Sequence, residues 1–358
     1  MSSILDRLKK NSKIKETAVI EQSTFFGVKD VAPTDVPMLN VALSGEVDGG
    51  VTSGLHILAG PSKHFKTSFA LVMAKAYLDK HKDSVILFYD SEFGSPKEYF
   101  QTFGIDTNRV MHTPVKNVEE LKFDMIAQLE GITRKDKVII VVDSIGNLAS
   151  KKEIEDAQNE KSVADMSRAK QLKSLFRMVT PYLTMNEIPM IAINHTYAEI
   201  SLFPRQIVSG GTGLYYSANS IFIIGRAQEK VGTEITGYHF KIKIEKSRFV
   251  KEASTIPISV MFDGGIMKYS GLFEEALDAG LIVKPKNGWY SIVDVETGEI
   301  EEKCHRAKAF VTKDMWIDNG LLERLKPKLR DKFKLVHTNA ISDDEVDAEF
   351  EQAITNGE

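Results

Sequence analysis

The chain has 358 residues, of which 42% are hydrophobic and 27% charged, a composition typical of globular proteins. At roughly 100–200 residues per domain, it is long enough for one large domain with smaller attachments, or for two domains. No apolar run approaches the ~18 residues that cross a bilayer, and the amino-terminal residues contain no apolar signal core. The single cysteine, Cys304, excludes an internal disulfide and a cysteine-rich metal site. We therefore expect a protein of the reducing cytoplasm, not a membrane protein, a secreted scaffold or a zinc module.

The net charge of −4 is unevenly distributed along the chain. Residues 341–358 hold seven acidic side chains and no lysine or arginine, so residues 1–340 carry a net charge of +3. A near-neutral body of this kind still binds DNA where its cations converge. The acidic segment is either a solvated terminus or a regulatory element that competes with DNA for the basic segment 326–334.

In chain order, the first elements are short. Ile4, Leu5 and Leu8, together with Ile14, predict a small amphipathic helix among basic residues. The β-branched and aromatic stretch 17–26 (TAVIEQSTFF) predicts a strand that adds either to its own sheet or to the edge of a neighbour's sheet.

From residue 36 to residue 269, apolar runs alternate with helical segments. Strands are expected at 54–59, 84–89, 138–142, 189–193 and 221–224, a helix at 67–80 and an edge strand at 239–244. Because continuous apolar runs separated by helices are typical of strands buried on both faces, we expect an α/β fold in which a mostly parallel sheet carries helices on both sides.

The pattern changes after residue 269. A helix at 271–279, a polar stretch around Trp289 and the basic segment 326–334 predict a small C-terminal α+β domain. We therefore divide the chain into an N-terminal segment (1–35), a core (36–269), a small domain (270–335) and an acidic tail (336–358).

A phosphate-binding loop is expected where the first buried strand meets the helix at 67–80. The pattern G-x-x-x-x-G-K-[ST] wraps backbone N–H groups around nucleotide phosphates at a helix N-terminus. Here it would comprise Gly60, Pro61, Ser62, Lys63, His64, Phe65, Lys66, Thr67 and Ser68. Lys66 would contact the β- and γ-phosphates of ATP and Thr67 would ligate Mg²⁺, but Phe65 stands where the pattern has glycine. On this stretch alone, a Gly-Pro turn followed by a chance Lys-Thr pair is the alternative.

Two carboxylates support the nucleotide interpretation. Asp143 ends the strand at 138–142, where a carboxylate is expected to hold Mg²⁺ through water. Glu92 follows the strand at 84–89 and would polarise an attacking water. Because the carboxyl ends of parallel strands form the ligand-binding edge of such sheets, these residues and the loop together predict ATP binding.

Several blocks of the sequence, taken in order, resemble the RecA-type DNA strand-exchange recombinases, most closely their phage branch. The blocks are PMLNVALSG (37–45), LHILAGPSKHFKT, YDSEFG, VIIVVDSIGNLAS and AINHTY, and the resemblance runs from about residue 20 to about residue 310. It implies a RecA-like ATPase that uses ATP and Mg²⁺, forms a helical homo-oligomeric filament on single-stranded DNA and exchanges strands with duplex DNA in recombination, repair and replication. It also implies a single-strand-binding protein and a loading mediator as partners, no membrane, and the host cytoplasm if a phage encodes the chain.

The resemblance further implies roles for individual residues in catalysis and ATP binding. Glu92 matches the family's catalytic glutamate, and Tyr99 matches a tyrosine that stacks on adenine; the alternative for Tyr99 is a half-buried helix residue. His195 ends the strand at 189–193, where the family senses the γ-phosphate, whereas a lone histidine is usually structural. Lys246 and Arg248 match cations that reach the ATP of the neighbouring subunit, although by themselves they indicate only a basic turn.

Two polar stretches resemble the family's DNA-binding loops, at 151–165 and 196–213. The second has 18 residues, long for a fold whose connections usually have ~2–6. Phe203 and Arg205 offer an apolar wedge and a phosphate contact, a chemistry that holds single strands without reading sequence. The residues expected to touch DNA are Lys170, Arg177, Phe203, Arg205, Gly210 and Gly211. The alternatives are disordered linkers for the loops and a solvated helix face for Lys170, Lys173 and Arg177.

Oligomerisation and competing functions complete the expectations. Phe25 and Phe26, in the strand expected at 17–26, should dock on an adjacent subunit. A ring helicase with the same core would usually need a separate amino-terminal domain, whereas only about 35 residues precede the core here. A non-catalytic mediator that uses ATP as a switch would not need Glu92.

Overall fold

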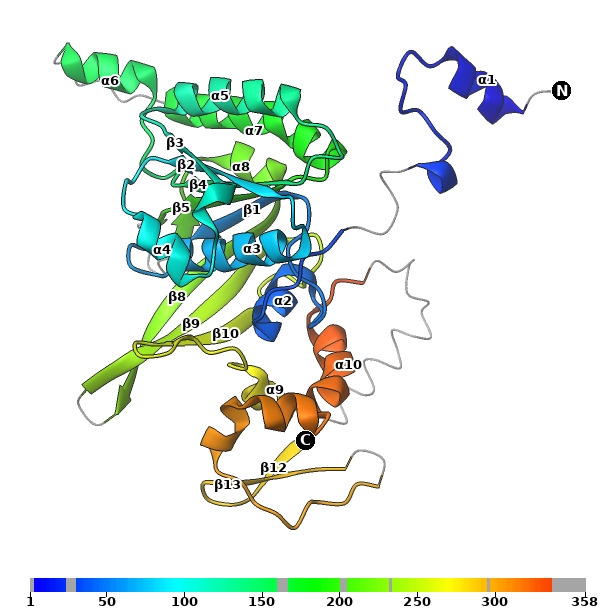
Figure 1. Cartoon of the computed structure of the whole chain (residues 1–358), viewed down its shortest axis with the longest axis vertical. Coiled ribbons are helices and arrows are strands. Elements are labelled where there is room, and N and C mark those ends of the chain that lie inside the picture. Colours follow the sequence, from blue (N-terminus) through cyan, green and yellow to red (C-terminus); the bar gives the residue numbers. More distant parts are fainter. Residues whose placement is uncertain are drawn as a thin grey trace.

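The computed structural model describes residues 3–23, 30–159, 167–199, 205–231, 234–294 and 297–336. A nine-stranded sheet crosses the centre of this part of the chain (Figure 1). Its parallel strands are β1 (Gly54–Ala59), β2 (Val85–Asp90), β3 (Val110–Pro114), β4 (Val138–Asp143), β5 (Pro189–Asn194) and β8 (Ala218–Val231). Its antiparallel strands are β9 (Glu234–Ser247), β10 (Thr255–Met261) and β11 (Gly265–Ile266). The order across the sheet is β11-β10-β9-β8-β1-β5-β4-β2-β3.

The expected α/β architecture is confirmed, and so are the apolar runs predicted as β1, β2, β4, β5 and β8. The prediction that 239–244 forms an edge strand is wrong. These residues lie within β9, which pairs with β8 on one side and with β10 on the other. Alternating apolar residues are typical of any strand with one solvated face, so the alternation could not tell an edge strand from an inner one. Neither β10 nor the short, partly exposed edge strand β3 was predicted from the sequence.

Helices cover both faces of the sheet (Figure 1). One face carries α5 (Val118–Gly131), α7 (Ser167–Met185) and α8 (Thr212–Ser217); the other carries α2 (Pro37–Ser44), α3 (Lys66–Lys80) and α4 (Lys97–Thr102). Because successive strand residues point to opposite faces, Leu58 of β1 packs in the core under α3, whereas Leu55 and Ile57 pack in the core under α7. No helix among the described residues is long and apolar enough to cross a membrane.

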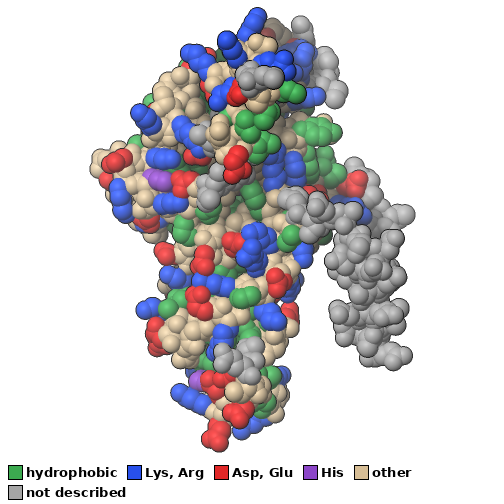
Figure 2. Space-filling view, turned by 90° about the vertical axis from the view of Figure 1, so that its right-hand side faces the viewer, with side chains coloured by type: hydrophobic (Ala, Val, Ile, Leu, Met, Phe, Trp, Pro, Cys, Tyr) green, Lys and Arg blue, Asp and Glu red, His purple; other side chains and the backbone are tan. Residues whose placement is uncertain are grey.

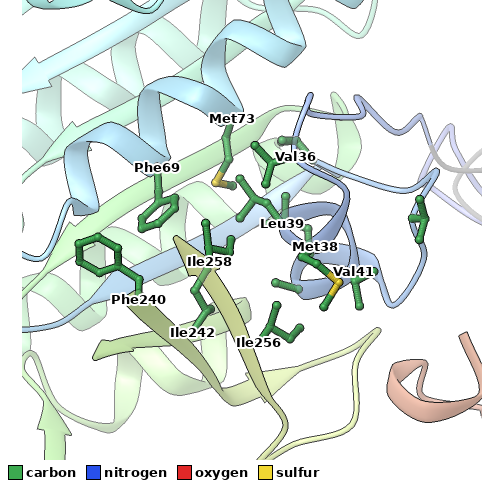
Figure 3. Close-up of a cluster of buried hydrophobic side chains, with 14 of the residues drawn as sticks. Val36, Met38, Leu39, Val41, Phe69, Met73, Phe240, Ile242, Ile256 and Ile258 are labelled. Carbon is green, nitrogen blue, oxygen red and sulfur yellow. The ribbon is translucent and has the colours of Figure 1, made fainter. Parts of the chain in front are cut away.

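The helix that follows the first strand is anchored on the antiparallel half of the sheet. In Figure 3, Phe69 and Met73 of α3 lie near Ile258 of β10 and Phe240 of β9, and Met38 of α2 lies beside them. All five side chains are fully buried. The start of α3 is therefore held by strands that lie far from it in the sequence.

The amino-terminal segment packs differently from what its sequence predicts. The expected helix is present as α1 (Ile4–Asn11), which begins at a capping box between Ser3 and Asp6 and leaves Ile4, Leu5 and Leu8 exposed. The strand predicted at 17–26 is wrong for its described part, which contains the 3-10 helix Ile20–Gln22, whereas residues 24–26 lie outside the described residues. A strand needs a partner for its backbone hydrogen bonds, and the described part of this segment pairs with no strand of the chain.

The C-terminal region contains α9 (Leu272–Asp278), the hairpin of β12 (Ile282–Lys286) and β13 (Trp289–Ile292), and α10 (Leu321–Phe333). Two short helical turns, Ala307–Val311 and Asp314–Asp318, lie between the hairpin and α10. The second turn contains the buried Trp316, whose indole N–H donates to the carbonyl of Phe310 in the first turn at 2.7 Å. Apolar residues of this region join the core under α3. The subdivision into domains stays a prediction.

The basic segment 326–334 is not the free positive surface that the sequence suggested. Lys326 pairs with Asp48 at 2.7 Å, Lys332 pairs with Glu275 at 2.7 Å, and Lys334 pairs with Glu46. Figure 2 shows basic and acidic side chains interspersed over this lower part of the molecule. The acidic residues at 341–358 lie outside the described residues, so the competition between the tail and DNA stays a prediction.

Candidate nucleotide-binding site

The predicted phosphate loop lies between β1 and α3. Gly60 leaves β1, and α3 begins at Lys66, with Phe65 as the residue that precedes its first turn. A Cβ atom on Gly60 would lie 2.8 Å from the carbonyl oxygen of Ile224, so a larger residue would displace the loop from β8. Residues 62–68 line a cavity of about 690 Å³ in front of the loop. Seven of the nine residues expected to cradle phosphates, 62–68, therefore line one concave surface, and Gly60 and Pro61 lie outside its lining.

A hydroxyl and a carboxylate meet at the start of α3. The Thr67 hydroxyl donates to Asp143 Oδ2 at 2.8 Å, and Oδ1 of Asp143 is buried without a hydrogen-bond partner among the described residues. The pKa of Asp143 is raised to about 6: burial is the largest cause, the charges of Glu92 and Asp90 act in the same direction, and the Thr67 hydrogen bond and the Lys66 charge oppose them. A buried carboxylate with an unused oxygen, next to a hydroxyl, is a donor set that suits Mg²⁺.

No group of three or more His, Cys, Asp or Glu side chains in the described ranges is arranged to hold a metal by itself. Mg²⁺ usually takes one or two protein oxygens and completes its shell with phosphate oxygens and water, so Thr67 and Asp143 are the residues that would hold it. Lys66 is buried beside this pair, and its ammonium donates to the Pro61 carbonyl at 2.8 Å. Burial lowers the pKa of Lys66, against the charges of Glu92 and Asp143, which raise it.

Glu92 and His195, predicted separately from two strand ends, lie together. Glu92 Oε1 accepts from the Ser144 hydroxyl at 2.6 Å and from the Asn147 amide at 3.1 Å, and it lies 3.3 Å from His195 Nε2. The hydrogen bond with His195 lowers the pKa of Glu92, and the Ser144 hydrogen bond and the Lys66 charge act in the same direction, against burial. A Cβ atom on Gly146 would lie only 2.2 Å from His195 Cδ2, so the imidazole needs glycine at this position.

The sequence did not predict Ser144 and Asn147 as partners of Glu92, although both belong to the polar stretch that directly follows Asp143. It also missed Arg168, in the first turn of α7. The Arg168 guanidinium donates to the carbonyls of Ile145, Gly146 and Leu148 at 2.7–2.9 Å and so holds the turn that carries Asn147.

Tyr99 lies on α4 at the rim of the same cavity and is half buried. Its hydroxyl shares a hydrogen bond of 2.5 Å with the Ser68 hydroxyl, and its ring meets Phe103 edge-on at 5.3 Å between centroids. Burial raises the pKa of Tyr99. Phe262, an exposed aromatic side chain that the sequence did not single out, also lines the cavity. The position of Tyr99 suits both of its alternatives, since it is a half-buried helix residue that also lines the cavity.

The stretches expected to be DNA-binding loops are partly regular. Residues Lys151–Gln158 form the helix α6, which Ser150 and Glu153 cap, and 160–166 lie outside the described residues. In the second stretch β6 (Thr196–Ala198) pairs with β7 (Gln206–Val208), so that part is a hairpin; Phe203 lies outside the described residues. Local backbone pairing satisfies hydrogen bonds that an irregular loop would leave to water.

The remaining DNA candidates lie along α7. Lys170 and Arg177 are exposed on this helix, and Arg205 is exposed at the start of β7. Gly210 and Gly211 have φ angles of 103° and 77° and approach the same helix: a Cβ on Gly210 would lie 3.5 Å from Leu172 Cδ1. The structure therefore brings the glycine-rich end of the second stretch against the helix that follows the first.

The two cations expected to act on a neighbour's nucleotide lie away from the cavity of their own chain. Lys246 donates to the carbonyls of Tyr215 and of Ala218, the latter at 2.9 Å, at the end of α8. Burial lowers the pKa of Lys246, and the nearby charge of Arg248 does so as well. Arg248 is exposed. Phe25 and Phe26, predicted to dock on a neighbouring subunit, lie outside the described residues.

A mostly parallel sheet, a strand–loop–helix phosphate loop and carboxylates at adjacent strand ends define the P-loop class of α/β proteins. The RecA N-terminal domain family matches residues 15–267, and the family described as "Bacteriophage T4, Recombination and repair protein, C-terminal domain" matches residues 269–324. The chain belongs to the RecA family.

Curated relatives agree with this assignment. The "Recombination and repair protein" of Enterobacteria phage T4 is 51% identical over 362 residues, which cover 99% of this chain and 92% of that protein. "Protein RecA" of Nocardioides sp. is 25% identical and covers 84% of this chain and 83% of its own length; that of Streptomyces rimosus is 26% identical and covers 84% and 77%. The resemblance to RecA-type recombinases, and to the phage recombinase UvsX, is thereby confirmed.

Proposed function

We propose that this RecA-family recombinase is a DNA-dependent ATPase that assembles into a filament on single-stranded DNA and pairs it with homologous duplex. The observation that carries the proposal is the convergence of Lys66, Thr67, Asp143 and Glu92 at the carboxyl edge of the parallel strands. The two stretches expected to bind DNA follow the strands that end at this edge: 196–213 comes one residue after β5, and 151–165 comes after β4 and the turn at 144–150.

The phosphate loop would bind the triphosphate through its backbone N–H groups and Lys66, with Mg²⁺ held by Thr67 and Asp143. Bound Mg²⁺ would neutralise phosphate charge. Tyr99 would stack on the adenine at the rim of the cavity, and its hydroxyl bond to Ser68 would hold the ring there.

Glu92 would orient and polarise the attacking water. Its lowered pKa keeps the carboxylate ionised at neutral pH, so it is able to accept a proton from water. His195 touches Glu92 and starts the β6–β7 hairpin, where the Ser209 amide donates to the His195 carbonyl at 3.1 Å. A shift of this hairpin on DNA would therefore move a direct partner of the catalytic carboxylate, and in this way His195 would couple DNA binding to hydrolysis.

Assembly would complete the site and create the DNA surface. Lys246 and Arg248 would act on the nucleotide of the adjacent subunit, and Phe25 and Phe26 would dock on that subunit. The exposed cations of α7, with Phe203, Arg205 and the glycines at 210–211, would hold single-stranded DNA through phosphate contacts and apolar wedging. A single-strand-binding protein and a loading mediator would be its partners.

One experiment tests this proposal against its two competitors. The ATPase rate is measured with and without single-stranded DNA, and the same mixtures are imaged by negative-stain electron microscopy. Hydrolysis stimulated by DNA, together with filaments, is expected. Rings would indicate a helicase, and binding without turnover would indicate a nucleotide-switched mediator; either result would overturn the proposal.

A further inference from the structure

The phosphate loop carries two side chains where glycine is usually preferred. Lys63 has a φ angle of 59° and Phe65 has a φ angle of 55°, both in the left-handed region. This conformation is unfavourable for residues with a Cβ atom, and it persists only where the surroundings hold it. The loop therefore needs external support to keep the shape that cradles phosphates.

Each of these two residues has its own contact with the hairpin of β8 and β9. The Arg226 guanidinium of β8 donates to the Lys63 carbonyl at 2.9 Å. The Phe65 ring packs against Phe240 of β9, with centroids 5.2 Å apart, and against Tyr238, with centroids 6.5 Å apart. The supports are themselves joined, since the Arg226 guanidinium lies 4.4 Å above the Tyr238 ring.

The hairpin that makes these contacts is itself held in the central sheet. Arg226 lies opposite Phe240 in the β8–β9 ladder, and β8 pairs in parallel with β1, the strand that leads into the loop. Phe240 also meets Phe69 of α3 edge-on at 5.8 Å. Both ends of the loop and its two left-handed residues are thus tied to the same pair of strands.

We propose that Arg226, Tyr238 and Phe240 are positioning residues for nucleotide binding, which hold the phosphate loop in the left-handed turn that glycine would otherwise provide. The inference rests on the proposed role of this loop in binding ATP. It assigns a specific task to the hairpin: the aromatic rings stabilise the turn at Phe65, and the Arg226 hydrogen bond stabilises the turn at Lys63. Loss of a support should weaken the affinity for ATP, with a smaller effect on kcat at saturating ATP.

A double-mutant cycle tests the aromatic support. Tyr238→Ala is made in the parent and in Phe65→Gly, where glycine adopts the turn without help. The dissociation constant of a fluorescent ATP analogue is measured with Mg²⁺ and without DNA. In the parent we expect Tyr238→Ala to weaken binding by about 5- to 30-fold, the size of one left-handed penalty. In Phe65→Gly it should weaken binding by less than about twofold. Equal losses in both backgrounds would overturn this half of the proposal.

A second cycle separates positioning by Arg226 from direct contact with phosphate. Arg226→Ala is made in the parent and in Lys63→Gly. Positioning predicts a loss of ATP affinity that largely disappears in Lys63→Gly, whereas a direct phosphate contact predicts the same loss in both and would overturn the assignment. Phe65→Asn replaces Phe65→Gly if that variant does not fold, since asparagine tolerates the left-handed region.

Two controls keep the outcomes distinct. His239→Ala, a change on β9 between Tyr238 and Phe240, should leave ATP affinity unchanged because alternate strand residues point to the other face. Lys66→Ala should lose ATP binding. If Lys66→Ala binds like the parent, the proposed function of the loop fails; if it loses binding while both cycles are additive, only the positioning role fails.

Discussion

Replacing Glu92 by glutamine is the sharpest test of the proposed chemistry, because the structure indicates that little else would change. The side-chain oxygen of the substituted glutamine can still accept from the Ser144 hydroxyl and the Asn147 amide, which now bond to Glu92 at 2.6 Å and 3.1 Å. Only the negative charge and the capacity to take a proton are lost. Removing this capacity should lower the hydrolysis rate by about 10²- to 10⁴-fold, or about 3–5 kcal/mol of barrier.

Nucleotide binding should survive the same change. Glu92 is a negative charge near the expected phosphate site, so its removal should leave ATP affinity unchanged or slightly tighter. Glu92→Gln should therefore trap filaments in the ATP-bound state, visible by electron microscopy after the parent protein has exhausted its ATP. The assays are a steady-state ATPase measurement with saturating single-stranded DNA and a titration with a fluorescent ATP analogue.

Glu98→Gln is the matched control, since Glu98 is an exposed carboxylate on α4. It should hydrolyse ATP within about twofold of the parent, as surface substitutions usually do. A Glu92→Gln rate equally close to that of the parent would refute the catalytic role of Glu92. A loss of ATP binding would instead show that its carboxylate holds the site together.

Four further predictions address neighbouring parts of the site and the chain's assembly. The pKa of Asp143 is raised to about 6, chiefly by burial, so its carboxylate takes up a proton as the pH drops through that value. The apparent affinity for Mg²⁺ should then fall, whereas the free energy of unfolding of the nucleotide-free protein should rise. An affinity for Mg²⁺ that stays constant from about pH 5 to pH 8 would contradict this. Gly146→Ala places a Cβ 2.2 Å from His195 Cδ2, so hydrolysis should fall while ATP affinity holds, and adding His195→Ala should cost no further rate. Tyr99→Ala should raise KM for ATP by about 5- to 100-fold through lost stacking, and Tyr99→Phe by much less; equal effects would rule stacking out. Deleting residues 1–30, which include Phe25 and Phe26, should leave a folded, ATP-binding monomer in size-exclusion chromatography, and filaments from this variant would show that the segment belongs to its own subunit.

Much of the fold and site was predictable from local patterns. The buried strands β1, β2, β4 and β5 are mostly apolar runs. Strands β2, β4 and β5 end in the polar residues Asp90, Asp143 and Asn194, and β1 leads into the glycine of the expected phosphate loop. Lys66 and Thr67 were predicted from their place at the end of a loop that joins a strand to a helix. Buried strands and strand–loop–helix connections depend on residues that are close in sequence, so the periodicity of hydrophobic residues is enough to predict them.

Elements that depend on a distant partner were misjudged or missed. The stretch 17–26 has strand-like composition, yet its described part finds no ladder partner in the chain. Strand β9 has the alternation of an edge strand, but β10 pairs with it. The stretches 151–165 and 196–213 are polar enough to suggest loops, although α6 is capped locally and β6 pairs with β7.

The sequence by itself determined which residues are candidates for the chemistry, because residue type and spacing along a strand or helix suffice to place a carboxylate, a lysine or a glycine at one edge of the sheet. Only the tertiary structure decided how these residues meet. Residues 76 positions apart join in the Thr67–Asp143 hydrogen bond. Glu92, after β2, contacts His195, after β5, although β4 lies between these two strands. The Phe65 ring packs against Tyr238 and Phe240. Such contacts depend on strand order and register, which hydrophobic periodicity along a single strand does not encode.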